Sequence, residues 1–184
     1  MNTPGFHDAL AGLFVYPDAD TRSRVDAARG ALEAEDPTLA HHLEPLTAAV
    51  DRSSVDDLEE LFTRTFDINP ACTLECGWHL YGEDYARGTF LVRMRGMLRE
   101  LGVEESAELP DHVTHVLPVL GRLPTETADA FAADRVLPAL DKMLEGFKEA
   151  ENPFHAALVG VTAALRSRHG AGALPPSEPV PDRR

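Results

Sequence analysis

Apolar residues recur every three or four positions along almost the whole chain. Two of the clearest sets are Val55, Leu58, Leu61 and Phe62, and Val113, Val116, Leu117 and Leu120. This spacing places apolar side chains on one face of an α-helix. No stretch shows a sustained alternation of apolar and polar residues, so a β-sheet is not expected. The pattern predicts an all-α fold, a single-domain compact helical bundle.

Residues that begin helices stand where the apolar pattern requires them. Asp36 precedes Pro37, and Ser54 stands three residues before Asp57, an arrangement that resembles a capping box. Proline lacks a backbone N–H, so prolines inside an apolar run should begin or kink a helix. The predicted helices are 5–16, 20–34, 37–50, 54–67, 74–81, 84–102, 111–122 and 125–168, the last interrupted near Pro138 and Pro153.

The chain divides into a helical domain, residues 1–169, and a C-terminal tail, residues 170–184. The last fourteen residues hold four prolines and no periodic apolar face, which predicts disorder. Gly102, Gly121 and Gly170 follow periodic runs, where glycine commonly ends a helix. The N-terminus has no basic region, and no apolar run reaches the length of a membrane span. We therefore expect a cytoplasmic protein that is not inserted in a membrane.

Acidic residues outnumber basic residues in this sequence. The chain has 31 Asp and Glu against 17 Lys and Arg, a formal net charge of −14. Nucleic-acid-binding proteins neutralise phosphates with clustered basic residues, so this balance argues against a nucleic-acid partner. It argues equally against docking on an anionic membrane. A basic partner is compatible with the charge.

Cys72, Cys76 and His79 are spaced i, i+4 and i+7, so on a helix they would share one face. With Glu75 nearby, they offer a set of metal ligands, and the two thiols offer a redox pair. Small buried cysteines that pack against a neighbouring helix explain the same pattern. A helical metal-binding or redox-sensing protein that uses Cys72, Cys76 and His79 is thus the alternative hypothesis.

The motifs of common enzymes are absent from the sequence. It contains no Gly-x-Ser-x-Gly elbow, no phosphate-binding Gly-x-x-x-x-Gly-Lys-[Ser/Thr] loop and no Gly-x-Gly-x-x-Gly turn. A helical phosphohydrolase is disfavoured because the expected central His-Asp pair is replaced by Asp111-His112. We predict a binding protein without catalytic residues and without a cofactor of its own.

Two short loops combine polar and aromatic residues in an unusual way. In the first, Gly82 ends an apolar segment, Asp84 can cap the next helix, and Arg87 falls in that helix's first turn. A cation there opposes the helix dipole, which suggests that Arg87 has a partner. In the second, Leu109-Pro110 leads into a helix that begins with Asp111 and His112, where a plain N-cap is the simpler interpretation.

Several segments, taken in order, resemble one known family over about residues 5–168. These segments are Leu13-Phe14-x-Tyr16-Pro17, Thr65-Phe66-Asp67, Trp78-His79-Leu80-Tyr81-Gly82-Glu83, Arg87-Gly88, Leu91-Val92-Arg93 and Glu108-Leu109-Pro110-Asp111-His112. The sequence resembles the nitrate reductase delta-subunit (NarJ/TorD) family of redox-enzyme maturation chaperones. The segment from Phe66 to Glu75 is most similar to the subgroup that accompanies dimethyl-sulfide-dehydrogenase-like, selenate- and chlorate-reductase-like and archaeal nitrate-reductase-like enzymes.

The resemblance implies a helical chaperone with no activity of its own. Such a chaperone binds the catalytic subunit of a molybdopterin oxidoreductase, including its N-terminal twin-arginine leader. It holds that subunit until the molybdenum bis-pterin guanine dinucleotide, a cofactor of the client, is inserted. Self-association as a homodimer is also implied. The client-binding residues carried over by the resemblance are Trp78, Tyr81, Gly82, Glu83, Arg87, Glu108, Pro110, Asp111 and His112.

A leader of this type combines adjacent arginines with an apolar stretch, which suggests roles for some of these residues. Asp111 and Glu83 are the expected contacts of the arginines, because carboxylates pair with guanidinium groups. Aromatic and apolar side chains would line the rest of the site, and the candidates are Trp78, Leu80, Tyr81 and Tyr85.

Overall fold

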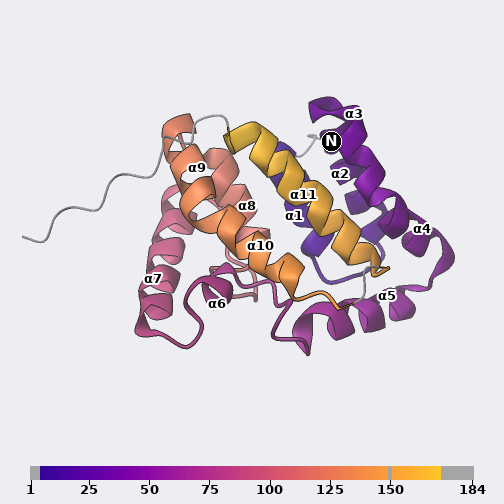
Figure 1. Ribbon diagram of the computed structural model, residues 1–184, viewed down its shortest axis with the longest axis horizontal. Coiled ribbons are helices and arrows are strands. Elements are labelled where there is room, and N and C mark those ends of the chain that lie inside the picture. Colours follow the sequence, from indigo (N-terminus) through magenta and orange to yellow (C-terminus); the bar gives the residue numbers. More distant parts are fainter. Residues whose placement is uncertain (1–4, 149–150, 171–184) are drawn as a thin grey trace, which may run out of the picture.

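The computed structural model describes residues 5–148 and 151–170, and within these ranges it contains helices and no β-strand (Figure 1). The prediction of an all-α single-domain fold is confirmed. The α-helices are α1 (Phe6–Ala11), α2 (Thr21–Glu35), α3 (Pro37–Ala40), α4 (Glu44–Arg52), α5 (Val55–Phe62), α6 (Cys76–Tyr81), α7 (Tyr85–Glu100), α8 (Val113–Arg122), α9 (Thr125–Phe131), α10 (Leu137–Glu145) and α11 (Pro153–His169). Short 3₁₀ turns are η1 (Gly12–Phe14) and η2 (His41–Leu43), and π-helical turns are η3 (Thr63–Asp67) and η4 (Ala132–Val136).

Helix α11 lies in the middle of the fold, where it packs against α10, α4 and α3 (Figure 1). Nine residues of α11 are buried, and most of them are apolar. Its first turn joins an aromatic cluster in which Phe154 meets Phe62 and Phe66 edge to face, with ring centroids 5.5 and 5.2 Å away. Aromatic pairs of this kind stabilise a core beyond the burial of their area.

The predicted capping residues adopt their expected roles. The Ser54 hydroxyl accepts a hydrogen bond from the Asp57 N–H, and the Asp57 carboxylate accepts one from the Ser54 N–H. Asp36 caps α3 by accepting a bond from the Thr38 N–H. Each such cap satisfies backbone donors that the first helical turn leaves open.

Prolines and local turns divide two of the predicted helices. The expected helix 37–50 is split into α3, η2 and α4, because Pro45 stands in the first turn of α4, where proline begins a helix readily. The expected interruption near Pro138 takes the form of the π-helical turn η4, after which α10 begins at Leu137. The interruption near Pro153 is confirmed as the start of α11.

The predicted helix ends are partly confirmed. Gly102 follows α7 with a φ of +64°, a conformation that favours glycine. Gly121, in contrast, lies inside α8, and a Cβ there would come within 2.8 Å of His7 Nδ1. Gly121 is thus a site of close packing against α1 and not a helix end. The proposed Pro-rich tail lies outside the described residues, apart from Gly170.

Candidate functional site

The segments that precede α6 and α8 lie side by side as a short antiparallel pair. Glu75 and His112 form an isolated β-bridge. The Cys76 N–H donates to the Asp111 carbonyl oxygen at 2.9 Å, and the Val113 N–H donates to the Leu74 carbonyl oxygen at 2.9 Å. The structure thereby joins the second sequence loop directly to the start of α6.

The Asp111 side chain turns inward from this junction. It is fully buried, and its Oδ2 atom accepts a hydrogen bond from the Gly77 N–H at 2.9 Å. The Arg87 Nε atom lies 3.9 Å from the same oxygen, and the guanidinium carbon lies 5.4 Å from the centroid of the Trp78 ring. The partner expected for Arg87 is therefore Asp111 together with Trp78.

Burial is the main influence on the Asp111 carboxyl and raises its pKa above the ordinary value. The Arg87 charge and the Gly77 N–H oppose this rise by stabilising the carboxylate. Among the described residues, neither Asp111 Oδ1 nor Arg87 Nε has a hydrogen-bond partner. Asp111 is thus a buried group that holds two loops together, and its side chain does not reach the surface where a leader arginine would bind.

Gly77 is a structural requirement of this junction that the sequence did not reveal. A Cβ at this position would lie 2.5 Å from Asp111 Oδ2 and 3.0 Å from Phe90 Cδ1. Gly77 lies within α6 and its φ is not positive, so the requirement comes from close approach and not from backbone conformation. No local pattern marks such a glycine, because the carboxylate that occupies the space is 34 residues away.

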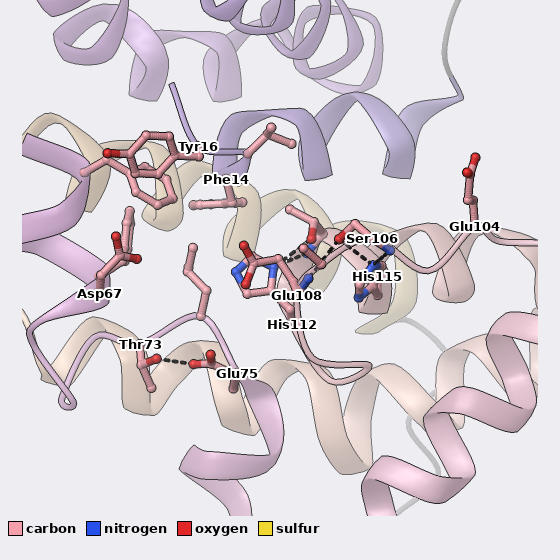
Figure 2. Close-up of a pocket in the computed structure, with 16 residues that line it drawn as sticks. Phe14, Tyr16, Asp67, Thr73, Glu75, Glu104, Ser106, Glu108, His112 and His115 are labelled. Atoms are coloured by element: carbon pink, nitrogen blue, oxygen red, sulfur yellow. Dashed lines mark hydrogen bonds between the residues drawn. The ribbon is translucent and has the colours of Figure 1, made fainter. Parts of the chain in front are cut away.

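Next to the junction lies an acidic and aromatic cavity of about 730 Å³, here called the groove (Figure 2). Its aromatic side chains are Phe14, Tyr16, Phe62 and Phe66, and its carboxylates are Asp67, Glu75, Glu104 and Glu108. His112 and His115 complete the polar part, and the described residues that line the groove include no Lys or Arg. The groove therefore suits a ligand that is both cationic and apolar.

Three of the segments that carried the sequence resemblance meet in this groove. The turn after α1 supplies Phe14 and Tyr16, the π-helical turn η3 supplies Phe66 and Asp67, and the second loop supplies Glu108 and His112. These residues are far apart in the chain, so only the packing of α1, α5 and α8 brings them together. The family resemblance draws on these segments, but it does not assign Phe14, Tyr16, Phe66 or Asp67 to the site.

His112, and not Asp111, is the N-cap of α8. Its Nδ1 atom accepts a hydrogen bond from the Thr114 N–H at 3.2 Å and lies 2.7 Å from the Thr114 hydroxyl. Burial lowers the pKa of His112 from 6.5 to about 4, although the Glu75 charge works in the opposite direction. His112 is therefore neutral near pH 7, with the proton on Nε2.

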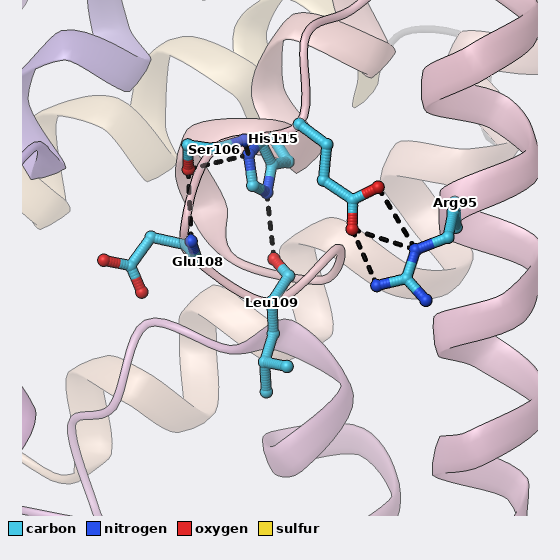
Figure 3. A network of polar contacts seen from close by, with 6 residues as sticks. Arg95, Ser106, Glu108, Leu109 and His115 are labelled. Atoms are coloured by element: carbon cyan, nitrogen blue, oxygen red, sulfur yellow. Dashed lines mark hydrogen bonds and ion pairs between the residues drawn. The ribbon is translucent and has the colours of Figure 1, made fainter.

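His115 fixes the loop that carries Glu108 (Figure 3). Its Nδ1–H donates to the Leu109 carbonyl oxygen at 2.9 Å, and its Nε2 atom accepts a bond from the Ser106 N–H at 3.0 Å. The same loop is tied to α7 where the Arg95 guanidinium donates to Glu105 at 2.7 and 2.9 Å. Glu108 thus lies on a loop that is held at both ends.

The remaining predicted site residues occupy different places. Pro110 is buried within the second loop. Tyr81 is half-buried against Phe90, with ring centroids 5.6 Å apart. Gly82 has a φ of +58° in the turn between α6 and α7, and Glu83 is exposed in the same turn. None of these four residues lines the groove.

The structure gives the cysteines a packing role. Both thiols are free and buried, and burial raises the pKa of each, so the reactive thiolate is disfavoured. The His79 Nε2 atom lies 2.7 Å from the Thr73 carbonyl oxygen, to which it is hydrogen-bonded. No group of three or more His, Cys, Asp or Glu side chains within the described ranges is placed to hold a metal ion. This geometry favours the packing explanation over a metal or redox site.

The described residues form an all-α fold with an acidic groove beside the junction of α6 and α8. A family model described as the nitrate reductase delta subunit matches residues 32–159, more than two thirds of the chain. The chain belongs to this family, the NarJ/TorD family of molybdoenzyme maturation chaperones. The match includes both loops and η3, whereas the Phe14–Tyr16 segment precedes it. No curated protein is significantly similar to the chain.

Within the described ranges, no helix combines the length and the apolar character needed to cross a bilayer.

Proposed function

We propose that this protein is a cytoplasmic, non-catalytic chaperone for the catalytic subunit of a molybdopterin-dependent oxidoreductase. It binds the subunit before the client's molybdenum bis-pterin guanine dinucleotide is inserted, and the groove takes the N-terminal leader. Membership of a maturation-chaperone family supports the first part. The second part is carried by the four carboxylates, by the absence of a cation among the described lining residues, and by the exposed side chains of Val15 and Tyr16.

The chemistry of a twin-arginine leader matches the two parts of the groove. Exposed carboxylates at Asp67, Glu104 and Glu108 would steer and pair with the adjacent arginines. The exposed side chains of Val15 and Tyr16 would cover the apolar residues that follow. In this arrangement Asp111, Arg87 and Trp78 position the second loop instead of touching the leader, and Glu83 is a more distant contact of the client.

Leader binding is tested by neutralising the groove without changing its shape. We expect Asp67→Asn/Glu108→Gln to weaken binding of a leader peptide about tenfold and to flatten its salt dependence, because two favourable charge interactions are lost. Isothermal titration at several salt concentrations measures both quantities. A peptide whose two arginines are replaced by alanine should bind wild type and variant equally.

The matched control is Asp26→Asn/Glu33→Gln, which removes the same two charges from the exposed face of α2. It should bind the leader as wild type does. Equal affinity and equal salt dependence for the groove variant and wild type would refute leader binding in the groove. If Glu83→Gln weakens binding instead, the site lies at the turn between α6 and α7.

The finer assignments remain predictions of the sequence. The subgroup that serves dimethyl-sulfide-dehydrogenase-like, selenate- and chlorate-reductase-like and archaeal nitrate-reductase-like enzymes rests on the Phe66–Glu75 segment. Copurification of the chain with a large molybdoenzyme subunit would identify the client directly.

A further inference from the structure

A cavity of about 260 Å³ lies between η3, the end of α10 and the start of α11, and it is here called the basic pocket. Its charged residues are Arg64 and Lys148, and no Asp or Glu is among the described residues that line it. This composition is unusual in a chain with a net charge of −14, and it is the reverse of the acidic groove. Asn69, Asn152 and the Thr65 hydroxyl complete the polar lining.

Close packing brings the end of α10 against the loop that follows η3. Gly146 makes this approach possible, because a Cβ there would overlap the Ala71 carbonyl oxygen. In the same loop the Asn69 Oδ1 atom accepts a hydrogen bond from the Ala71 N–H at 3.2 Å, which leaves the amide nitrogen as a donor. Burial raises the pKa of the Cys72 thiol, while the Asn69 amide and the Lys148 charge act in the opposite direction. Both polar groups therefore lie close to the buried thiol in the pocket.

Another part of the pocket wall is fixed by hydrogen bonds at the start of α11. The Asn152 Nδ2 atom donates to the Thr65 hydroxyl at 2.9 Å, and the Asn152 Oδ1 atom accepts a bond from the Phe154 N–H at 3.0 Å. The Thr65 hydroxyl in turn donates to the Leu61 carbonyl oxygen at 2.7 Å. An amide nitrogen carries two donors, so Asn152 keeps one N–H for a ligand. Asn152 is also the N-cap of α11 and stands at the positive end of its helix dipole.

The acidic residues around the pocket leave its charge positive. The Arg64 guanidinium lies 3.9 Å from the Glu60 carboxylate, and these side chains are 62% and 78% exposed. A pair this exposed contributes little, so Arg64 can turn to a ligand. Glu145 and Glu151, which flank this region in the chain, are exposed and do not line the pocket.

We propose that the basic pocket binds a small oxyanion such as phosphate. Arg64 and Lys148 supply the opposite charge, and the amides of Asn69 and Asn152 supply neutral donors, so the ion receives charge-assisted hydrogen bonds. A volume of about 260 Å³ is below the range of about 300–1,000 Å³ that is usual for larger organic ligands, which favours a single ion over a nucleotide. Different residues of η3 line this pocket and the groove, so the site is separate from the proposed leader site.

Phosphate binding is tested by NMR titration of the full chain, with sodium chloride used to hold the ionic strength constant. In wild type, the backbone amide signals of Asn69, Cys72 and Lys148 should shift and reach saturation. Arg64→Gln/Lys148→Gln should weaken binding about tenfold or more, because both charge interactions are lost. Asn69→Asp keeps the acceptor for the Ala71 N–H but places a negative charge in the pocket, so it should abolish saturable binding.

The matched control is Arg93→Gln/Arg99→Gln, which removes two positive charges from exposed positions of α7. It should bind phosphate as wild type does. Shifts that grow with phosphate without saturating, or equal affinity in wild type and the pocket variant, would overturn the proposal. Glycerol 3-phosphate is the second probe: tighter binding than that of inorganic phosphate identifies a phosphate ester as the ligand, and weaker binding identifies the free ion. Phosphate titration needs no leader peptide, so this proposal and leader binding in the groove can fail independently.

Discussion

Acidification from pH 7 to pH 4 is expected to lower the free energy of unfolding by about 3 kcal/mol for each of His7 and His112. In the folded protein the pKa of both side chains is lowered from 6.5 to about 4, mainly by burial. Between pH 4 and pH 6.5 the unfolded chain therefore binds more protons than the folded protein does. The contribution to stability is fully present above pH 6.5 and is lost as the pH falls toward 4.

The surroundings of His7 show why its neutral form is favoured. Its Nε2 atom lies 2.9 Å from the His169 Nε2 atom, and the His169 Nδ1 atom lies 2.8 Å from an Asp129 carboxylate oxygen. After burial, the His169 charge contributes most to lowering the pKa of His7, with a smaller contribution from Arg168. Protonation would thus strain the contact that joins α1 to α11. Asp111 contributes to the pH dependence of stability with the opposite sign. Its pKa is raised in the folded protein, so its protonation at low pH removes a buried charge and favours the folded state.

Chemical unfolding at pH 7, 5.5 and 4 measures this dependence. His112→Asn keeps an N-cap acceptor for the Thr114 N–H but cannot titrate, so it should lose about 3 kcal/mol less than wild type between pH 7 and pH 4. The control is His41→Asn, because the His41 side chain is 74% exposed. A pH dependence in His112→Asn that equals that of wild type would show that His112 is not buried in its neutral form.

Gly77→Ala is expected to destabilise the protein by about 3 kcal/mol, the largest effect that we expect from adding one methyl group. The new Cβ would lie 2.5 Å from Asp111 Oδ2, so the carboxylate or α6 must move. Movement breaks the hydrogen bond from the Gly77 N–H and leaves a buried charge with less compensation. Thermal or urea unfolding measures the loss.

Two comparisons separate this cause from the general effect of replacing glycine in a helix. Gly30 lies in α2, and a Cβ there meets nothing within 4 Å, so Gly30→Ala should be neutral or stabilise the protein by up to about 1 kcal/mol. In an Asp111→Ala background the main obstacle is gone, and Gly77→Ala should cost clearly less than in wild type. Additive effects of the two substitutions would contradict a direct contact between residues 77 and 111.

The sequence predicted the site in part. It indicated that Arg87 needs a partner, because a cation in the first turn of a helix is electrostatically unfavourable. The structure supplies Asp111 and Trp78 as that partner. The sequence also placed Asp111 and His112 at the start of α8, but it could not tell which one caps the helix and which one turns into the core. That choice depends on Gly77, whose small size makes room for a carboxylate from a distant segment.

The helical periodicity, the caps and the prolines by themselves determined the all-α class and most helix positions, because these signals act between residues a few positions apart. The sequence also indicated the residues of both loops as candidates for the binding site. Only the tertiary structure decided that Phe14, Phe66 and Glu108 share one groove and that Asp111 is buried. Such contacts join segments separated by tens of residues, and they follow from how whole helices pack, which no local pattern encodes.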